Sequence, residues 1–188
     1  MNRSTLVRGV VIPAFALIGF FAATSARADD MVANPKYSAW AKFKVGSNST
    51  MDADMEVGGN KFHIQTVRTL ISLDADKVVI ESKTTVNIMG HDQAEPATRE
   101  TIASKIGKDQ IIATGEKEIS AMGKTFKCKV YQAKGNPDMK QDHMGANTEA
   151  MKATVYTNDD VPGGLVEIDT TGNDGKGLTF VLTAMEAK

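Results

Sequence analysis

Residues 50–57 read TMDADMEV, a strict alternation of polar and apolar side chains. In an extended chain, successive side chains point to opposite faces, so the carboxylates share one face and the apolar groups share the other. This period of two predicts a strand of an antiparallel sheet with one buried and one hydrated face. The apolar face would carry Met51, Ala53, Met55 and Val57.

The segment that follows predicts a hairpin with an irregular second strand. Residues 58–60 read GGN and tolerate the positive φ of a tight turn. In the returning strand Phe62 and Ile64 have one parity, whereas Val67, Ile71 and Leu73 have the other. We therefore predict a β-bulge between Gln65 and Val67, which would restore one continuous apolar face.

The remaining chain shows the same alternation, interrupted by turn residues such as glycine, asparagine, aspartate and proline. Pro96 cannot donate a backbone hydrogen bond, so its segment is predicted to be an edge strand or to be interrupted there. The further strands are expected at residues 61–73, 77–89, 93–106, 110–120, 124–134, 149–158, 164–171 and 177–186.

One segment near the start favours a helix instead. Residues 35–43 bring Tyr37, Trp40 and Phe43 together at a spacing of three, with Pro35 in the first turn. The sequence thus predicts a single all-β domain at residues 29–188, in which about nine antiparallel strands form one strongly curved sheet or open half-barrel with a short N-terminal helix.

Residues 1–28 have the three parts of a secretion signal. Arg3 and Arg8 precede an apolar stretch, and small residues at Ala26 and Ala28 mark a cleavage site. Cleavage after Ala28 would remove three arginines and no acidic residue, which changes the formal net charge from −1 to −4. We therefore expect a periplasmic or secreted protein that has no stable membrane insertion after cleavage and does not bind nucleic acid.

The residues that could carry catalysis are few. Cys128 is the only cysteine and shares the parity of Phe126 and Val130, which predicts a buried, inert thiol. No serine occupies a Gly-x-Ser-x-Gly motif. We expect a non-enzymatic protein without a cofactor.

Two kinds of binding site remain. Residues 138–144 gather Met139, His143 and Met144, soft ligands that suit copper, although a solvated loop explains the same residues. The apolar face of a curved sheet could instead hold a hydrophobic ligand, unless the same side chains fill a closed core. The predicted ligand-binding residues are Trp40, Met51, Met55, Ile64, Ile80, Val86, Ile88, Val130, Val155, Ile168, Phe180 and Leu182.

Several motifs resemble known proteins. The motifs GKTFKCKVY at 123–131 and VYTNDDVPGGLVEI at 155–168, with NPKYSAWAKFKVG at 34–46 and the last strand LTFVLTAM at 178–185, resemble an uncharacterised family of secreted bacterial β-proteins. More distantly, the helix, the antiparallel meander and the late Pro-Gly turn are similar to the LolA-like half-barrel of periplasmic lipoprotein carriers. That resemblance implies an open barrel with a helix plugging an apolar cavity, and Trp40 would belong to the plug.

These observations leave three functional hypotheses. The first is an exported, non-catalytic protein that binds or carries a hydrophobic ligand, a lipid or a lipoprotein. The alternative is a structural or interaction protein of the cell envelope with a closed core, which meets its partner through an exposed sheet edge or through the turn at Val161 to Gly164. The third is a copper protein that uses the 138–144 loop.

Overall fold

The computed structural model describes residues 31–57, 60–107, 113–133, 152–171 and 177–188. These residues form twelve strands and one helix: β1 (Met31–Ala33), α1 (Pro35–Ala41), β2 (Asn48–Val57), β3 (Asn60–Leu73), β4 (Lys77–Ile88), β5 (His91–Ala94), β6 (Thr98–Ala103), β7 (Lys105–Gly107), β8 (Ala113–Ala121), β9 (Lys124–Ala133), β10 (Lys152–Thr157), β11 (Leu165–Thr171) and β12 (Gly177–Glu186).

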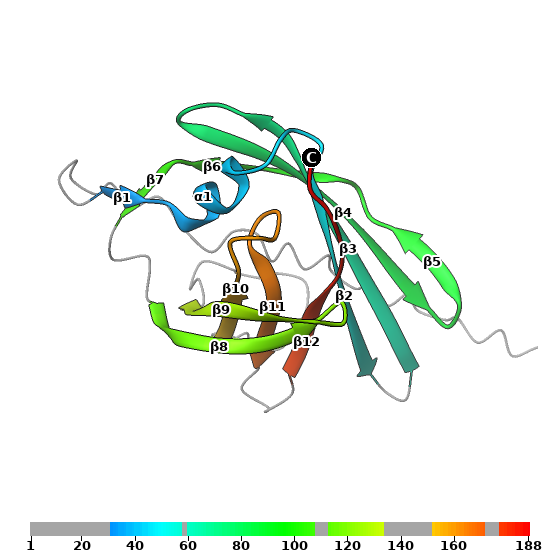
Figure 1. The fold of residues 1–188 in the computed structure, drawn as a ribbon. Coiled ribbons are helices and arrows are strands. Elements are labelled where there is room, and N and C mark those ends of the chain that lie inside the picture. The colour runs from blue at the N-terminus through cyan, green and yellow to red at the C-terminus, as the bar shows by residue number, and fades with distance from the viewer. Residues whose placement is uncertain (1–30, 58–59, 108–112, 134–151, 172–176) are drawn as a thin grey trace, which may run out of the picture.

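Ten of the strands form one antiparallel sheet in the order β5-β4-β3-β2-β12-β11-β10-β9-β8, with β6 also paired to β4. Strand β12, the last in the sequence, lies between β2 and β11 and joins the two halves. The sheet is strongly curved, and β8 does not pair with β5 or β6 among the described residues, so it is not closed into a barrel (Figure 1). The predicted open antiparallel sheet with a short helix is confirmed.

The interruption predicted at Pro96 is also confirmed. It explains part of the difference between the twelve observed strands and the nine that the sequence predicted. The expected strand at 93–106 is interrupted at residues 95–97 and again at Ser104, which gives β5, β6 and β7. Strands β5 and β6 pair with successive parts of β4 at the edge of the sheet. Strand β7 leaves the main sheet and pairs with β1.

The predicted bulge between Gln65 and Val67 is wrong. The β2–β3 register runs without a shift from Asn48 to Val57, and the irregularity in the β3–β4 pairing lies between Leu70 and Ser72. From Phe62 to Leu70 the buried face of β3 keeps one parity, and this face includes a charged residue, Arg68, at a core position. A pattern of apolar residues alone could not show this continuity.

Helix α1 begins at a well-formed cap. The Asn34 side chain accepts a hydrogen bond from the Lys36 N–H (3.0 Å) and donates one to the Ala103 carbonyl (2.9 Å), and Pro35 occupies the first turn. The helix ends at Ala41, two residues before the predicted boundary. The Trp40 side chain is fully buried.

The turn between β10 and β11 packs directly against α1. Val161 to Gly164 are all buried, and the Gly163 N–H donates to the Ala39 carbonyl (3.3 Å). A β-carbon on Gly163 would lie 2.5 Å from two ring carbons of Trp40, so the indole contacts the bare backbone. The turn is therefore not the exposed partner surface that the alternative hypothesis predicts. The exposed sheet edge stays a prediction.

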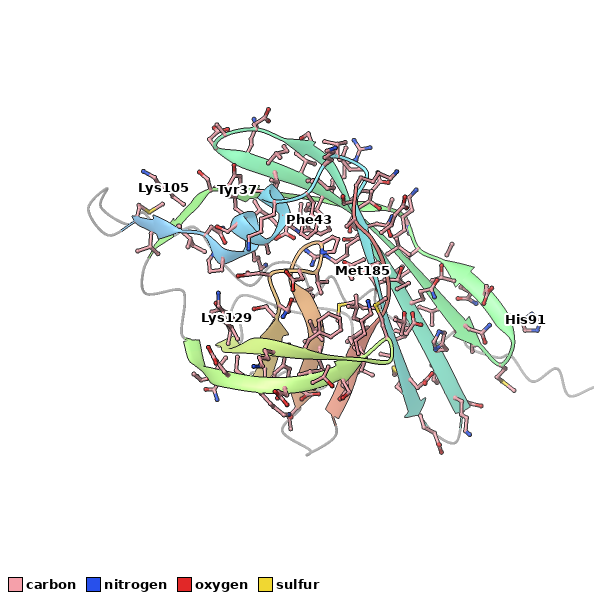
Figure 2. All side chains as sticks on the ribbon, viewed as in Figure 1. Tyr37, Phe43, His91, Lys105, Lys129 and Met185 are labelled. Carbon is pink, nitrogen blue, oxygen red and sulfur yellow. The ribbon has the colours of Figure 1, made fainter. Side chains whose placement is uncertain are left out.

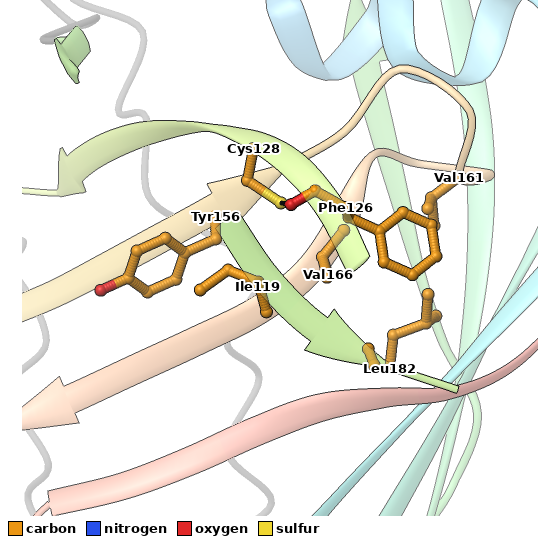
Figure 3. Packing of buried hydrophobic residues seen from close by; sticks show 8 residues of the cluster. Ile119, Phe126, Cys128, Tyr156, Val161, Val166 and Leu182 are labelled. Carbon is orange, nitrogen blue, oxygen red and sulfur yellow. Dashed lines mark hydrogen bonds between the residues drawn. The ribbon is translucent and has the colours of Figure 1, made fainter. Parts of the chain in front are cut away.

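The apolar residues form three clusters. The first joins the β8–β9 hairpin to β10–β12 and contains Ile119, Phe126, Cys128 and Tyr156 (Figure 3). The second spreads over β2, β3, β4, β10, β11 and β12, and the third lies under α1 around Trp40. His91, at the β4–β5 hairpin, points away from all three (Figure 2).

Replacing Gly163 with alanine should destabilise the fold. The residue has φ +77°, and its new methyl group would also clash with the Trp40 ring. We expect a loss of about 3 kcal/mol in the free energy of unfolding, measured by urea denaturation. Gly90→Ala is the control, because it has φ +89° but no atom within 4 Å of the new β-carbon, and it should cost about 1–2 kcal/mol. Equal losses in the two variants would show that the contact with Trp40 contributes nothing.

Candidate functional site

The inner face of the sheet is the face that carries Met51, Ile64 and Val86 and on which Trp40 of α1 packs against its neighbours. Because neighbouring strands are in register, its side chains form rows across β2, β3 and β4. From the helix outward the rows are Leu70 with Ile80, then Ser49 with Arg68 and Ser82, then Met51 with Thr66 and Thr84, then Ala53 with Ile64 and Val86, and finally Met55 with Phe62 and Ile88.

The apolar side chains of the two outer rows, together with Met51, belong to a larger group. They join side chains from β10, β11 and β12 in one cluster, which we call the apolar strip. Its central residues are buried, whereas those at its rim are half-buried. The apolar strip consists of Met51, Ala53, Phe62, Ile64, Val86, Ile168 and Phe180, with Met55, Ile88, Val155, Leu165 and Leu178 at its rim.

The structure brings most of the predicted ligand-binding residues together. Trp40 and Ile80 lie instead in the cluster under the helix, and Val130 and Leu182 lie in the cluster at the β8–β9 hairpin. The remaining eight belong to the apolar strip: Met51, Met55, Ile64, Val86, Ile88, Val155, Ile168 and Phe180. Their role in binding a ligand stays a prediction.

Sequence reasoning missed the row of Ser49, Arg68 and Ser82. All three are buried, and their Oγ, Nε and Oγ atoms have no hydrogen-bond partner. Glu100, beside Arg68, has a buried Oε2 atom in the same state. Among the described residues only one other side chain, that of Asp52, carries such a buried atom, and Asp52 has the opposite strand parity to Met51 on β2. Each unpaired buried polar group costs about 1–3 kcal/mol, so their concentration in one row calls for a physical explanation.

The surroundings of Arg68 combine charge and an aromatic ring. Its Nη2 atom lies 3.7 Å from Glu100 Oε2, and Lys36 Nζ lies 3.6 Å from Glu100 Oε1. The Arg68 guanidinium lies over the Trp40 ring, 5.7 Å from its centre. Burial lowers the pKa of both Arg68 and Lys36, and Glu100 opposes that shift. Two basic groups therefore share one carboxylate.

A sequence signal for Arg68 did exist. Arg68 has the parity of Ile64 and Leu70, two buried neighbours on the same strand. The predicted bulge moved the apolar face to the other parity at Val67 and so assigned Arg68 to solvent. The signal is a long charged residue at a strand position whose neighbours of the same parity are apolar.

The opposite face of β2 and β3 is hydrated, as predicted. Asp54 and Glu56 are exposed, and His63 Nδ1 lies 2.9 Å from Asp54 Oδ1. Within the described ranges, no group of three or more His, Cys, Asp or Glu side chains is arranged to hold a metal ion. The copper candidates Met139, His143 and Met144 lie outside the described residues, as do the signal segment and its cleavage site.

The lone cysteine is buried, as the strand parity predicts. Cys128 is 1% exposed, and its thiol donates a weak hydrogen bond to the Phe126 carbonyl (3.6 Å). Burial raises the pKa of this thiol to about 11, and the nearby Glu167 carboxylate adds to the shift. The thiol is therefore protonated at neutral pH.

Comparison with known proteins adds little to this site. The sequence matches no protein-family model and no curated protein. One similar solved structure is that of a DUF1329 family protein from Desulfovibrio piger, at 8% identity and a TM-score of 0.24, over 81% of this chain and 92% of that one. A likeness of this size carries no weight for fold or function, which rest on the residues described above. No helix in the described ranges has the length and apolar character to span a bilayer.

Cys128 should react slowly with a thiol reagent in the folded protein. At pH 8, a thiol with pKa about 11 is ionised roughly a hundredfold less often than one with pKa 9.0. Modification by dithionitrobenzoate should therefore be at least a hundred times slower in buffer than in 6 M urea, and it should accelerate as the pH rises toward 11. Equal rates in the two solutions would contradict the buried position.

Neutralising Glu100 should destabilise the protein. Glu100→Gln leaves Arg68 and Lys36 without their shared carboxylate, and removing one partner from a buried ion pair costs about 3 kcal/mol. Urea denaturation measures the loss. Glu81→Gln is the matched control, because Glu81 pairs with the exposed Arg99 at 3.0 Å, and surface pairs contribute little. Similar effects of the two substitutions would show that the Arg68 pair is not a buried one.

Proposed function

We propose that this protein is exported and that it binds a hydrophobic ligand, lipid or lipoprotein on the inner face of its sheet, without catalysis. One observation carries the proposal: the apolar strip extends without interruption over six strands, from Val155 on β10 to Val86 on β4. Its half-buried rim residues leave apolar surface on an open curved sheet, and such a surface suits a long apolar group.

The position of the helix supports the same proposal. Helix α1 makes its main contacts with β4 and β6, and it lies away from the hairpin ends of β2 and β3 (Figure 1). The apolar strip therefore lies beyond the part of the inner face that the helix covers. This is the arrangement that the resemblance to lipoprotein carriers implies, with Trp40 in the plug at one end.

The chemistry of the strip favours a ligand without a fixed shape. Its side chains are mainly aliphatic, and Met51 and Met55 are unbranched and adapt to irregular surfaces. Each square ångström of apolar surface removed from water contributes roughly 25 cal/mol. Binding would thus follow the length of the apolar group rather than any single contact.

The interaction-protein alternative has weaker support. Its proposed turn at Val161 to Gly164 is buried against the helix. Its other surface, the edge strand β8, presents the exposed charged residues Glu116, Lys117 and Glu118. Charged side chains on an edge oppose the addition of another strand.

The purified full-length chain should carry lipid and should bind a neutral apolar dye. Organic extraction followed by mass spectrometry identifies the lipid, and Nile red fluorescence measures binding. Met55→Lys places a charge at the rim of the apolar strip and should weaken Nile red binding several-fold, since burying a charge in an apolar surface is costly.

Glu56→Lys is the control for this experiment. Glu56 is the next residue on β2, is exposed and points to the opposite face, so the same new charge should leave dye binding unchanged. Absence of both extracted lipid and Nile red fluorescence in the wild-type protein would refute the proposed function. If both substitutions weaken Nile red binding equally, the dye does not bind at the apolar strip.

A further inference from the structure

We propose that the row formed by Ser49, Arg68 and Ser82 binds the anionic head group, a carboxylate or a phosphate, of an amphiphile whose chain lies on the apolar strip. The inference rests on the proposed function, because it names the class of ligand that the same inner face would take. It assigns a role to the unpaired polar atoms that the apolar strip leaves unexplained.

The row combines one buried guanidinium with two buried hydroxyls. The Arg68 side chain is 9% exposed, and Nε has no partner. Ser49 and Ser82 are its direct cross-strand neighbours on either side, and both hydroxyls are buried and unpaired. A guanidinium between two hydroxyls offers a set of hydrogen-bond donors, and oxyanions are the ligands that match it.

The charge of the Arg68 guanidinium also favours an anion. Arg68 is the cationic group of the row, and Glu100 is the carboxylate beside it. The distance of 3.7 Å between Arg68 Nη2 and Glu100 Oε2 exceeds that of a hydrogen bond, and Arg68 Nε has no hydrogen-bond partner. An anion beside Arg68 would pair with the guanidinium and accept a hydrogen bond from its Nε–H.

The row lies on the inner face between the cluster under the helix and the apolar rows. On one side, Leu70, Ile80 and Trp40 close the inner face beneath the helix. On the other side, the hydroxyls of Thr66 and Thr84 lie 3.2 Å apart and satisfy each other, and the apolar rows begin directly beyond them. From Arg68 to Phe62 the strand extends on the order of 20 Å, which gives a long alkyl chain a path in one direction only.

The test compares two ligands that differ in their head group. Palmitate and 1-hexadecanol share the same chain, and each is titrated against Nile red bound to the full-length protein. Palmitate should bind at least tenfold more tightly to the wild-type protein. Arg68→Gln should abolish this preference by weakening palmitate binding at least tenfold, and Arg68→Lys should retain part of it.

Arg99→Gln is the matched control, since Arg99 is an exposed arginine at the sheet edge, and this variant should keep the full preference. Trp40, the only tryptophan, gives a second readout, because its ring lies beside Arg68. Palmitate should change its fluorescence in the wild-type protein, whereas hexadecanol should change it less. The wild-type comparison needs no variant, so it decides the matter even where Arg68→Gln does not fold.

The outcomes separate the two proposals. Equal affinity for the two ligands, or a preference that survives in Arg68→Gln, overturns the head-group site and leaves the proposed function intact. Absence of Nile red binding and of any palmitate effect on Trp40 overturns both. Inorganic phosphate and acetate distinguish the source of the anion: if either binds as tightly as palmitate, the row is a site for free anions and the amphiphile inference is wrong.

Discussion

The contact between the Trp40 indole and the bare backbone of Gly163 holds the two ends of this fold together. It joins the first helix to the turn that links β10 and β11, and only a glycine leaves room for it. Helix α1 has seven residues and would not be stable alone. Its place over the sheet depends on this contact and on the Asn34 cap. The indole in turn positions Arg68, which lies over its ring.

The sequence predicted the architecture better than the site. The alternation at 50–57, the signals at Pro35 and Pro96 and the parity of Cys128 are local, and the structure agrees with each of them. The buried turn at Val161 and the ion pair of Arg68 depend on residues far apart in the sequence. Their burial follows from tertiary contacts, which no local pattern records.

The error at Gln65 and the failure to find Arg68 have one physical cause. Periodicity analysis treats every charged residue as a marker of solvent, yet a buried guanidinium is tolerated where a carboxylate and an aromatic ring accompany it. The bulge was predicted because Val67, Ile71 and Leu73 have the opposite parity to Phe62 and Ile64, and it placed Arg68 on the outer face. Strand β3 has no such bulge between Gln65 and Val67, where its pairing with β2 and β4 runs without a shift, and its inner face is polar at Arg68 and Thr66.

The placement of β12 between β2 and β11 has a consequence for the time at which the protein can fold. Strands β2 to β4 lie on one side of it and β8 to β11 on the other, so the two halves become one sheet only after the last strand has left the ribosome. The pairing of β2 with β12 spans most of the chain, and contacts of such long range form slowly. The sheet of a nascent chain therefore stays in two separate parts until β12 has been synthesised.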